Sequence, residues 1–196
     1  MQVEVMQIIG NWDEGYALHK HTLSSTYIGD DANGHPQFHT TRSEPGEALF
    51  RLKYRADRSQ VAPIAAALYA HILPKFETIG LIIPMPASTV RVLQPVGEIA
   101  NELGRLANIP VFPNIIVKAP APQGAPQLKN LNTKEEKVAA LEGRFTLNPA
   151  ITSQGCWNAL MLDDLFDTGA TMEAVCAVLR TYPKIARIFA TTATRK

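Results

Sequence analysis

The chain has 196 residues, with 19 lysines and arginines against 18 aspartates and glutamates, so its formal net charge is +1. This length fits one domain with a hydrophobic core, and the near-zero charge gives no electrostatic footprint for nucleic acid or an anionic membrane. No apolar run approaches the roughly 18 residues of a membrane span, and the first ten residues lack the basic segment of a signal peptide. We therefore expect a cytoplasmic protein with no membrane partner, in which Cys156 and Cys176 are both buried free thiols.

The first 79 residues are predicted to form a β-rich hood, within a single domain that spans residues 1–196. Short alternating stretches predict strands at residues 3–6, 23–28 and 38–42. Residues 29–36, between the last two strands, are rich in Gly, Asp, Asn and Pro, which favours a β-hairpin.

Two helices are predicted next, over residues 46–55 and 61–73. In the first, Lys53 and Arg55 flank Tyr54. These two cations could reach a phosphate, and a solvated helix face explains them equally well.

From Gly80 the pattern becomes strand, helix, strand, over residues 81–84, 96–107 and 114–118. This order predicts a βαβ unit and a parallel sheet, with residues 80–196 as the core of the domain. The loop after the first strand carries hydroxyl groups and Arg91, and a diphosphate could lie against it.

Residues 119–132 are rich in Pro, Gln, Gly and Asn, which predicts a long functional loop. Thr133 and Glu136 then match a capping box that opens a helix through Leu141. Four lysines lie along this segment: Lys118, Lys129, Lys134 and Lys137. The segment suits a lid that brings positive charge to a diphosphate and excludes water, and the alternative is a solvated amphipathic helix.

The motif that carries the main functional prediction spans residues 159–171. Four apolar residues predict a buried parallel strand, and Asp163 and Asp164 follow at the edge where open α/β sheets bind ligands. The turn from Asp167 to Thr171 then leads into a helix over residues 172–180, and its backbone N–H groups, hydroxyls and glycine suit a phosphate. Paired carboxylates suit a diol or Mg²⁺. The motif therefore predicts a site for a phosphorylated ribose, and the alternative is a strand that ends in an acidic N-cap loop.

Residues 160–171 resemble the phosphoribosyl diphosphate (PRPP) signature of type I phosphoribosyltransferases over twelve consecutive positions. The strand, the Pro-x-Pro loop and the following helix further resemble the ComF family of competence-associated phosphoribosyltransferases. That family usually has Arg-Gly-Phe-Asn-Gln in this loop, of which Arg91 alone is kept, and Ala140 stands where asparagine is usual. The resemblance implies an α/β fold with a mainly parallel central sheet flanked by helices, bound Mg²⁺ and PRPP, and a homodimer.

The resemblance also implies a role for each residue of the site. Asp163 and Asp164 would hold the ribose hydroxyls, directly or through Mg²⁺. The 5′-phosphate would be held by Thr168, Gly169, Ala170 and Thr171. The diphosphate would be held by Ala87, Ser88, Arg91 and the four lysines of the lid. Asp167 resembles the acid proposed as general base in purine-salvage relatives, and an N-cap is its alternative role.

We therefore expect transfer of the phosphoribosyl group of PRPP to a nitrogen nucleophile such as a nucleobase, with release of diphosphate. Two alternatives remain: a PRPP-sensing or competence-accessory protein without turnover, and a metal-dependent phosphohydrolase at the acid pair. The sequence does not specify the acceptor, for which Trp12, Tyr16 and Tyr54 are candidate stacking residues.

Overall fold

The chain folds around a five-stranded, mostly parallel sheet, seen in a computed structural model that describes residues 1–87, 94–124, 126 and 128–196. In spatial order the strands are β1 (Met6–Gln7), β2 (Glu14–Lys20), β9 (Ile185–Arg195), β8 (Trp157–Phe166) and β5 (Leu81–Pro84). β1 and β2 pair antiparallel, and the other three pairings are parallel. The predicted α/β class with a mainly parallel sheet is confirmed.

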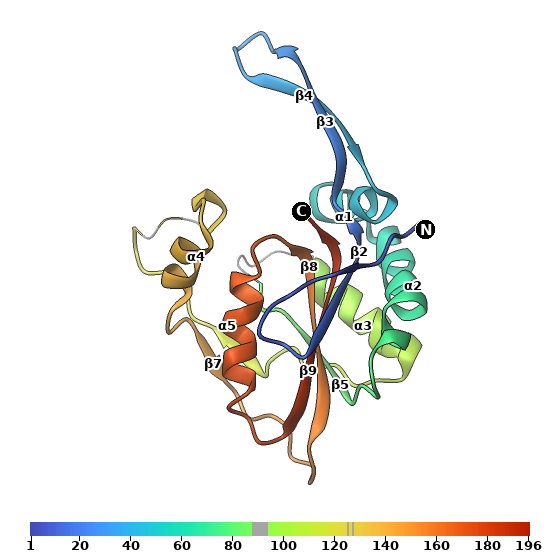
Figure 1. Cartoon of the computed structure of the whole chain (residues 1–196), viewed down its shortest axis with the longest axis vertical. Coiled ribbons are helices and arrows are strands. Elements are labelled where there is room, and N and C mark those ends of the chain that lie inside the picture. The colour runs from blue at the N-terminus through green and yellow to red at the C-terminus, as the bar shows by residue number, and fades with distance from the viewer. Residues whose placement is uncertain (88–93, 125, 127) are drawn as a thin grey trace.

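Helices cover both faces of this sheet (Figure 1). α5 (Ala170–Leu179) lies on one face, and α1 (Glu44–Tyr54), α2 (Val61–His71) and α3 (Pro95–Ala107) lie on the other. Side chains of β8 alternate between the two layers, since Met161 belongs to the apolar cluster of α5 and Leu160 to that of the other three helices. Burial on both faces explains why the centre of β8 is a continuous apolar run.

Beyond the carboxyl ends of β5 and β8, the chain continues toward opposite edges of the sheet. β8 continues through α5 into its neighbour β9, whereas β5 continues through α3 to Val111, which forms a parallel bridge with Ile82 on the opposite side of β5. Such a reversal of direction opens a crevice beyond the carboxyl ends of the two strands, and α/β sheets bind ligands there.

The strand predicted at residues 114–118 does not extend the central sheet, so the predicted βαβ unit needs a correction. β6 (Ile116–Lys118) pairs antiparallel with β7 (Phe145–Leu147) in a separate two-stranded sheet. The loop predicted at residues 119–132 and the helix α4 (Lys134–Leu141) form the connection between these two strands, and α4 packs against α5.

The N-terminal part contributes both a hairpin and strands of the central sheet. β3 (Thr22–Asp30) and β4 (Pro36–Arg42) form the predicted hairpin, which extends away from the body of the molecule (Figure 1). β2, which the sequence analysis missed, lies beside β9, so the central sheet crosses the proposed division at residue 80. The division into hood and core stays a prediction.

Three short 3₁₀ helices complete the described elements: Arg58–Gln60, Leu73–Lys75 and Leu128–Asn130. Of the two cysteines, Cys176 is buried as predicted, but Cys156 is exposed, because it lies in the turn before β8 and outside the apolar layers. Among the described residues, no helix combines the length and the apolar character that a membrane crossing requires.

Candidate functional site

The acid pair lies within β8, past the last residue of β5. The pairing of β5 with β8 ends at Leu162, whereas β8 continues beside β9 to Phe166, so the strand does not end before the acids as expected. Successive side chains of a strand point to opposite faces. Asp163 therefore faces the layer of α5, and Asp164 faces the layer of α1 and α3.

A cavity of about 160 Å³ lies at the N-terminal end of α5. Its lining includes Asp163, Lys137 and the four residues predicted to hold a phosphate: Thr168, Gly169, Ala170 and Thr171. Gly169 is the N-cap of α5 and has a φ of +80°, in the left-handed region that favours glycine. The helix thus begins without a side-chain cap, and the N–H groups of its first turn and its positive dipole end suit an anion.

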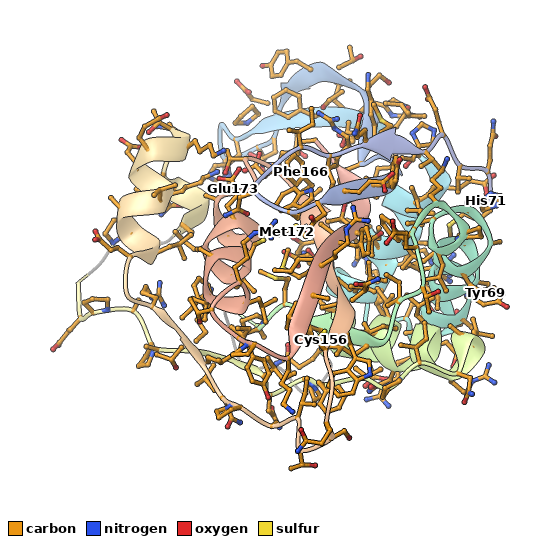
Figure 2. All side chains as sticks on the ribbon, turned by 60° about the horizontal axis from the view of Figure 1, so that its bottom comes forward. Tyr69, His71, Cys156, Phe166, Met172 and Glu173 are labelled. Carbon is orange, nitrogen blue, oxygen red and sulfur yellow. The ribbon has the colours of Figure 1, made fainter. Side chains whose placement is uncertain are left out.

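An aromatic pair supports this loop from behind. The rings of Trp12 and Phe166 meet edge to face with centroids 6.1 Å apart, and a Cβ atom on Gly169 would lie 3.0 Å from the ring of Phe166. Phe166 and Met172 of α5, both labelled in Figure 2, line this cavity together. Trp12 is buried and donates a hydrogen bond to the carbonyl of Ile8, so it supports the wall of the loop and does not offer a face for stacking.

The other two stacking candidates differ from each other in exposure. Tyr16 is partly buried, packs against Phe76 and donates a hydrogen bond to Glu14. Tyr54, at the end of α1, is 63% exposed. Tyr54 is thus the candidate whose ring remains open to solvent.

A second cavity, of about 380 Å³, lies on the other side of the acid pair. Its lining includes the last residue of β5, Pro84, residues 85–87 after this strand, the first residues of α3, and both acids. The predicted Ala87 belongs to this lining, whereas Ser88 and Arg91 lie outside the described residues. Lys53 is the one basic side chain in the described lining, and its Nζ atom lies 2.9 Å from Oδ2 of Asp164.

Both cavities are lined by Asp163 and Thr171, so the acid pair lies between them. The backbone N–H of Asp164 donates to Oδ1 of Asp163 at 2.8 Å. Burial, and then the charge of Asp164, raise the pKa of Asp163 to about 7, against the opposing effects of that hydrogen bond, Lys53 and Lys118. Asp163 is therefore poised to change its charge near neutral pH.

The acid pair has the donor chemistry of a magnesium site. Mg²⁺ prefers oxygen ligands, and it commonly binds one or two carboxylates together with water and the phosphate oxygens of a substrate. Asp163 and Asp164 match that set. In the described part of the chain no group of three or more His, Cys, Asp or Glu side chains could hold a metal, so an ion here would complete its shell with water and ligand oxygens.

The predicted lid lysines lie in different environments. Lys137 of α4 lines the first cavity, and its Nζ atom lies 2.7 Å from Oδ2 of Asp167. Lys134 instead pairs at 2.7 Å with Glu173 of α5, so the structure does not bring it into the site. The predicted capping box of Thr133 is present.

Lys118, at the end of β6, is half-buried beside the ring of Phe145. Burial, and then Arg144, lower the pKa of Lys118, and the charge of Asp163 acts in the opposite direction. Lys118 is therefore electrostatically coupled to the acid pair. The side chain of Lys129 lies outside the described part of the chain.

Asp167, predicted as a general base, is exposed and pairs with two lysines. Besides Lys137, the Nζ atom of Lys196 lies 3.4 Å from its Oδ1 atom. The hydrogen bond from Lys137 is the largest of the effects that hold the pKa of Asp167 below its usual range. Its carboxylate is therefore a weak base in this arrangement.

Sequence analysis missed Lys196 and left Lys53 open between a phosphate contact and a solvated face. Lys196 reaches the site because β9 runs parallel to β8 and ends beside Phe166. A strand that follows α5 is expected to lie beside β8 and parallel to it, and this general rule could have placed the end of the chain near the site. No signal in the sequence joins Lys53 to Asp164.

The chain matches no protein-family model and no curated protein. Among solved structures it is similar to adenine phosphoribosyltransferase from Saccharomyces cerevisiae, with 10% identity, 89% of this chain and 85% of that chain covered, and a TM-score of 0.46. The enzyme of the same kind from Trypanosoma brucei gives 11% identity, 97% and 74% coverage, and a TM-score of 0.49. The one from Thermoanaerobacter pseudethanolicus gives 12% identity, 88% and 95% coverage, and a TM-score of 0.41. Because their TM-scores are below 0.5, these likenesses do not indicate an activity for this chain. Only the residues and geometry of the site can indicate one.

Proposed function

We propose that this protein is a phosphoribosyltransferase that binds PRPP with Mg²⁺ and transfers the phosphoribosyl group to a nitrogen nucleophile. The observation that carries the proposal is the position of the acid pair between two cavities, one of them at the open N-terminus of α5. PRPP has a phosphate at one end, a diol in the middle and a diphosphate at the other end, which is the order of groups that this arrangement would accommodate.

In this proposal the first turn of α5, with Thr168 and Thr171, holds the 5′-phosphate. Asp163 and Asp164 hold the ribose hydroxyls, or Mg²⁺ bound to them. The diphosphate occupies the second cavity beside Ala87, and from their place in the sequence Ser88 and Arg91 complete its contacts. When bound, Mg²⁺ would neutralise negative charge on the departing diphosphate.

Transfer breaks the bond between the ribose carbon and the diphosphate oxygen, which leaves with the electron pair, and forms a bond from the same carbon to the nitrogen. The sugar becomes cationic as the bond breaks, so the protein acts mainly by positioning and by placing negative charge nearby. The proton released by the nitrogen would go to Asp167. Because Lys137 weakens that carboxylate as a base, this role requires Lys137 to leave Asp167 when the acceptor binds.

The finer features of the proposal come from the sequence resemblance. The Pro-x-Pro loop and Arg91 favour a ComF-like member of this class. We propose on the same basis that it is cytoplasmic and homodimeric, and that a nucleobase is its acceptor.

Calorimetric titration with PRPP in the presence of Mg²⁺ tests the proposal. The wild type should bind in the micromolar range, and Asp163→Asn/Asp164→Asn should abolish binding. Asp30→Asn/Asp31→Asn is a matched control, because it neutralises another adjacent acid pair, on the exposed hairpin, and should bind like the wild type. Absence of PRPP binding by the wild type would refute the proposal.

Product analysis with a panel of nucleobases then separates the alternatives. Diphosphate and a nucleotide are expected. Binding without any product would instead support an accessory protein, and release of inorganic phosphate would support a phosphohydrolase.

A further inference from the structure

Lys53 is held in place at the site by its helix. The hydroxyl of Ser43 caps α1 by accepting a hydrogen bond from the N–H of Gly46 at 3.0 Å. Leu49 and Leu52 are almost completely buried under the sheet, and α1 contacts β9. Lys53 follows directly at the border of this buried face, which places its ammonium group over the end of β8.

The ion pair that Lys53 makes differs from a surface salt bridge. Lys53 and Asp164 have side chains that are only 19% and 17% exposed, and their charged atoms are 2.9 Å apart. Partial burial of both groups reduces screening by water and salt. The pair therefore holds Asp164 as a partly shielded carboxylate whose charge is already compensated.

A divalent cation at the acid pair would need the same carboxylate. An ammonium group and a metal ion on one carboxylate repel each other, so each weakens the binding of the other. The second cavity offers Lys53 another partner, because Lys53 itself lines this cavity, next to the loop after β5. An anionic group bound in that cavity would be within reach of the displaced ammonium group.

We propose that Lys53 is an exchangeable counter-ion: it holds Asp164 in the metal-free protein, and it moves onto the anionic group of the ligand when a divalent cation binds the acid pair. Charge stays balanced in this exchange. The metal ion binds the carboxylate that Lys53 leaves, and the ammonium group of Lys53 then neutralises negative charge on the ligand. The identity of the anion as the diphosphate of PRPP rests on the proposed function.

Removal of the Lys53 charge should change the affinities for metal and anion in opposite directions. Mn²⁺ binding to the ligand-free protein, measured by electron paramagnetic resonance, should become about tenfold tighter in Lys53→Met, because a cation beside a metal ligand is removed. Binding of inorganic diphosphate at saturating Mg²⁺, measured by calorimetry, should become about tenfold weaker in the same variant. Lys53→Arg keeps the charge, and its Mn²⁺ affinity should remain close to that of the wild type.

Arg51→Met is the matched control. Arg51 lies on the same helix and forms an ion pair of 2.7 Å with Asp57, but it does not line the cavity. Both affinities should be unchanged in this variant. Structural damage to the site by Lys53→Met would instead weaken both.

The Mn²⁺ titration decides the inference without reference to turnover. Unchanged, weaker or undetectable Mn²⁺ binding in Lys53→Met would overturn it, even if the wild type converts PRPP. Tighter Mn²⁺ binding together with weaker diphosphate binding would support it, even if no nucleobase is accepted and the proposed transferase function fails.

Discussion

The ammonium nitrogen of Lys137 in α4 lies 2.7 Å from a carboxylate oxygen of Asp167, the residue that follows β8 and opens the phosphate loop. One turn of α4 earlier, Lys134 forms a similar pair with Glu173 of α5. The helix of the predicted lid is thus tied to the phosphate loop at one point and to α5 at another. Of these two contacts, only that of Lys137 involves Asp167 and can change its pKa.

We predict that Lys137→Met raises the pKa of Asp167 toward the usual range of an aspartate. The hydrogen bond from Lys137 is the largest effect that lowers this pKa, and the substitution removes it. NMR titration of the side-chain carboxyl carbons measures the change. Lys134→Met is the control, because its partner is Glu173, and the pKa of Asp167 should not move. An unaltered pKa in Lys137→Met would show that the pair does not form in solution.

The raised pKa of Asp163 predicts that its contribution to stability decreases as the pH rises. Most aspartates, whose pKa is lowered on folding, contribute more at higher pH. Its pKa is about 7 in the folded protein against an ordinary value of 3.8, so between these values the native state keeps a proton that the unfolded state has released. Its stabilising contribution is therefore present at low pH and is lost as the pH rises through about 7. The loss amounts to at most about 4 kcal/mol.

Urea denaturation without divalent cations, at about pH 5 and about pH 8, measures this effect. The free energy of unfolding of the wild type minus that of Asp163→Asn should be smaller at the higher pH than at the lower pH. Asp57→Asn is the control, because hydrogen bonds, the first from Ser59, lower the pKa of Asp57, and its contribution changes only at more acidic pH. A wild-type minus Asp163→Asn difference that stays constant would mean that Asp163 is already ionised in the acidic range.

Gly169→Ala should weaken phosphate binding, and Gly124→Ala should not. Both glycines have a φ close to +80°, so each substitution should lower the free energy of unfolding by about 1–2 kcal/mol through the backbone alone. A Cβ atom on Gly124 would meet nothing within 4 Å, whereas on Gly169 it would press on the ring of Phe166, which Trp12 holds in place. The ring or the loop would therefore have to move by a few tenths of an ångström.

Calorimetric titration with inorganic phosphate and urea denaturation together test this prediction. Gly169→Ala should be the less stable variant and should lose affinity at least severalfold, with Gly124→Ala close to the wild type in affinity. Equal affinities in the two variants would exclude the phosphate loop as the binding site.

Features that depend on neighbouring residues were predictable from sequence. The apolar run of β8, the turn residues of the β3–β4 hairpin and the capping box of α4 were all predicted, because the physical signal is contained in a few consecutive residues. β2 and β7 were missed. β2 forms a strand because it pairs with β9, which lies near the other end of the chain in sequence. Nothing within the seven residues of β2 indicates that partner.

The sequence by itself determined the candidate site in outline: an acid pair directly after the apolar run of a buried strand, followed by a glycine turn at a helix N-terminus. Hydrogen-bonding capacity and backbone conformation are properties of those residues in that order. Only the tertiary structure decided which charges surround them, with Lys53 on Asp164, Lys137 and Lys196 on Asp167, and Lys134 turned away to Glu173. Electrostatic interactions depend on distance in space, and the packing of α1 and α4 on the sheet sets those distances.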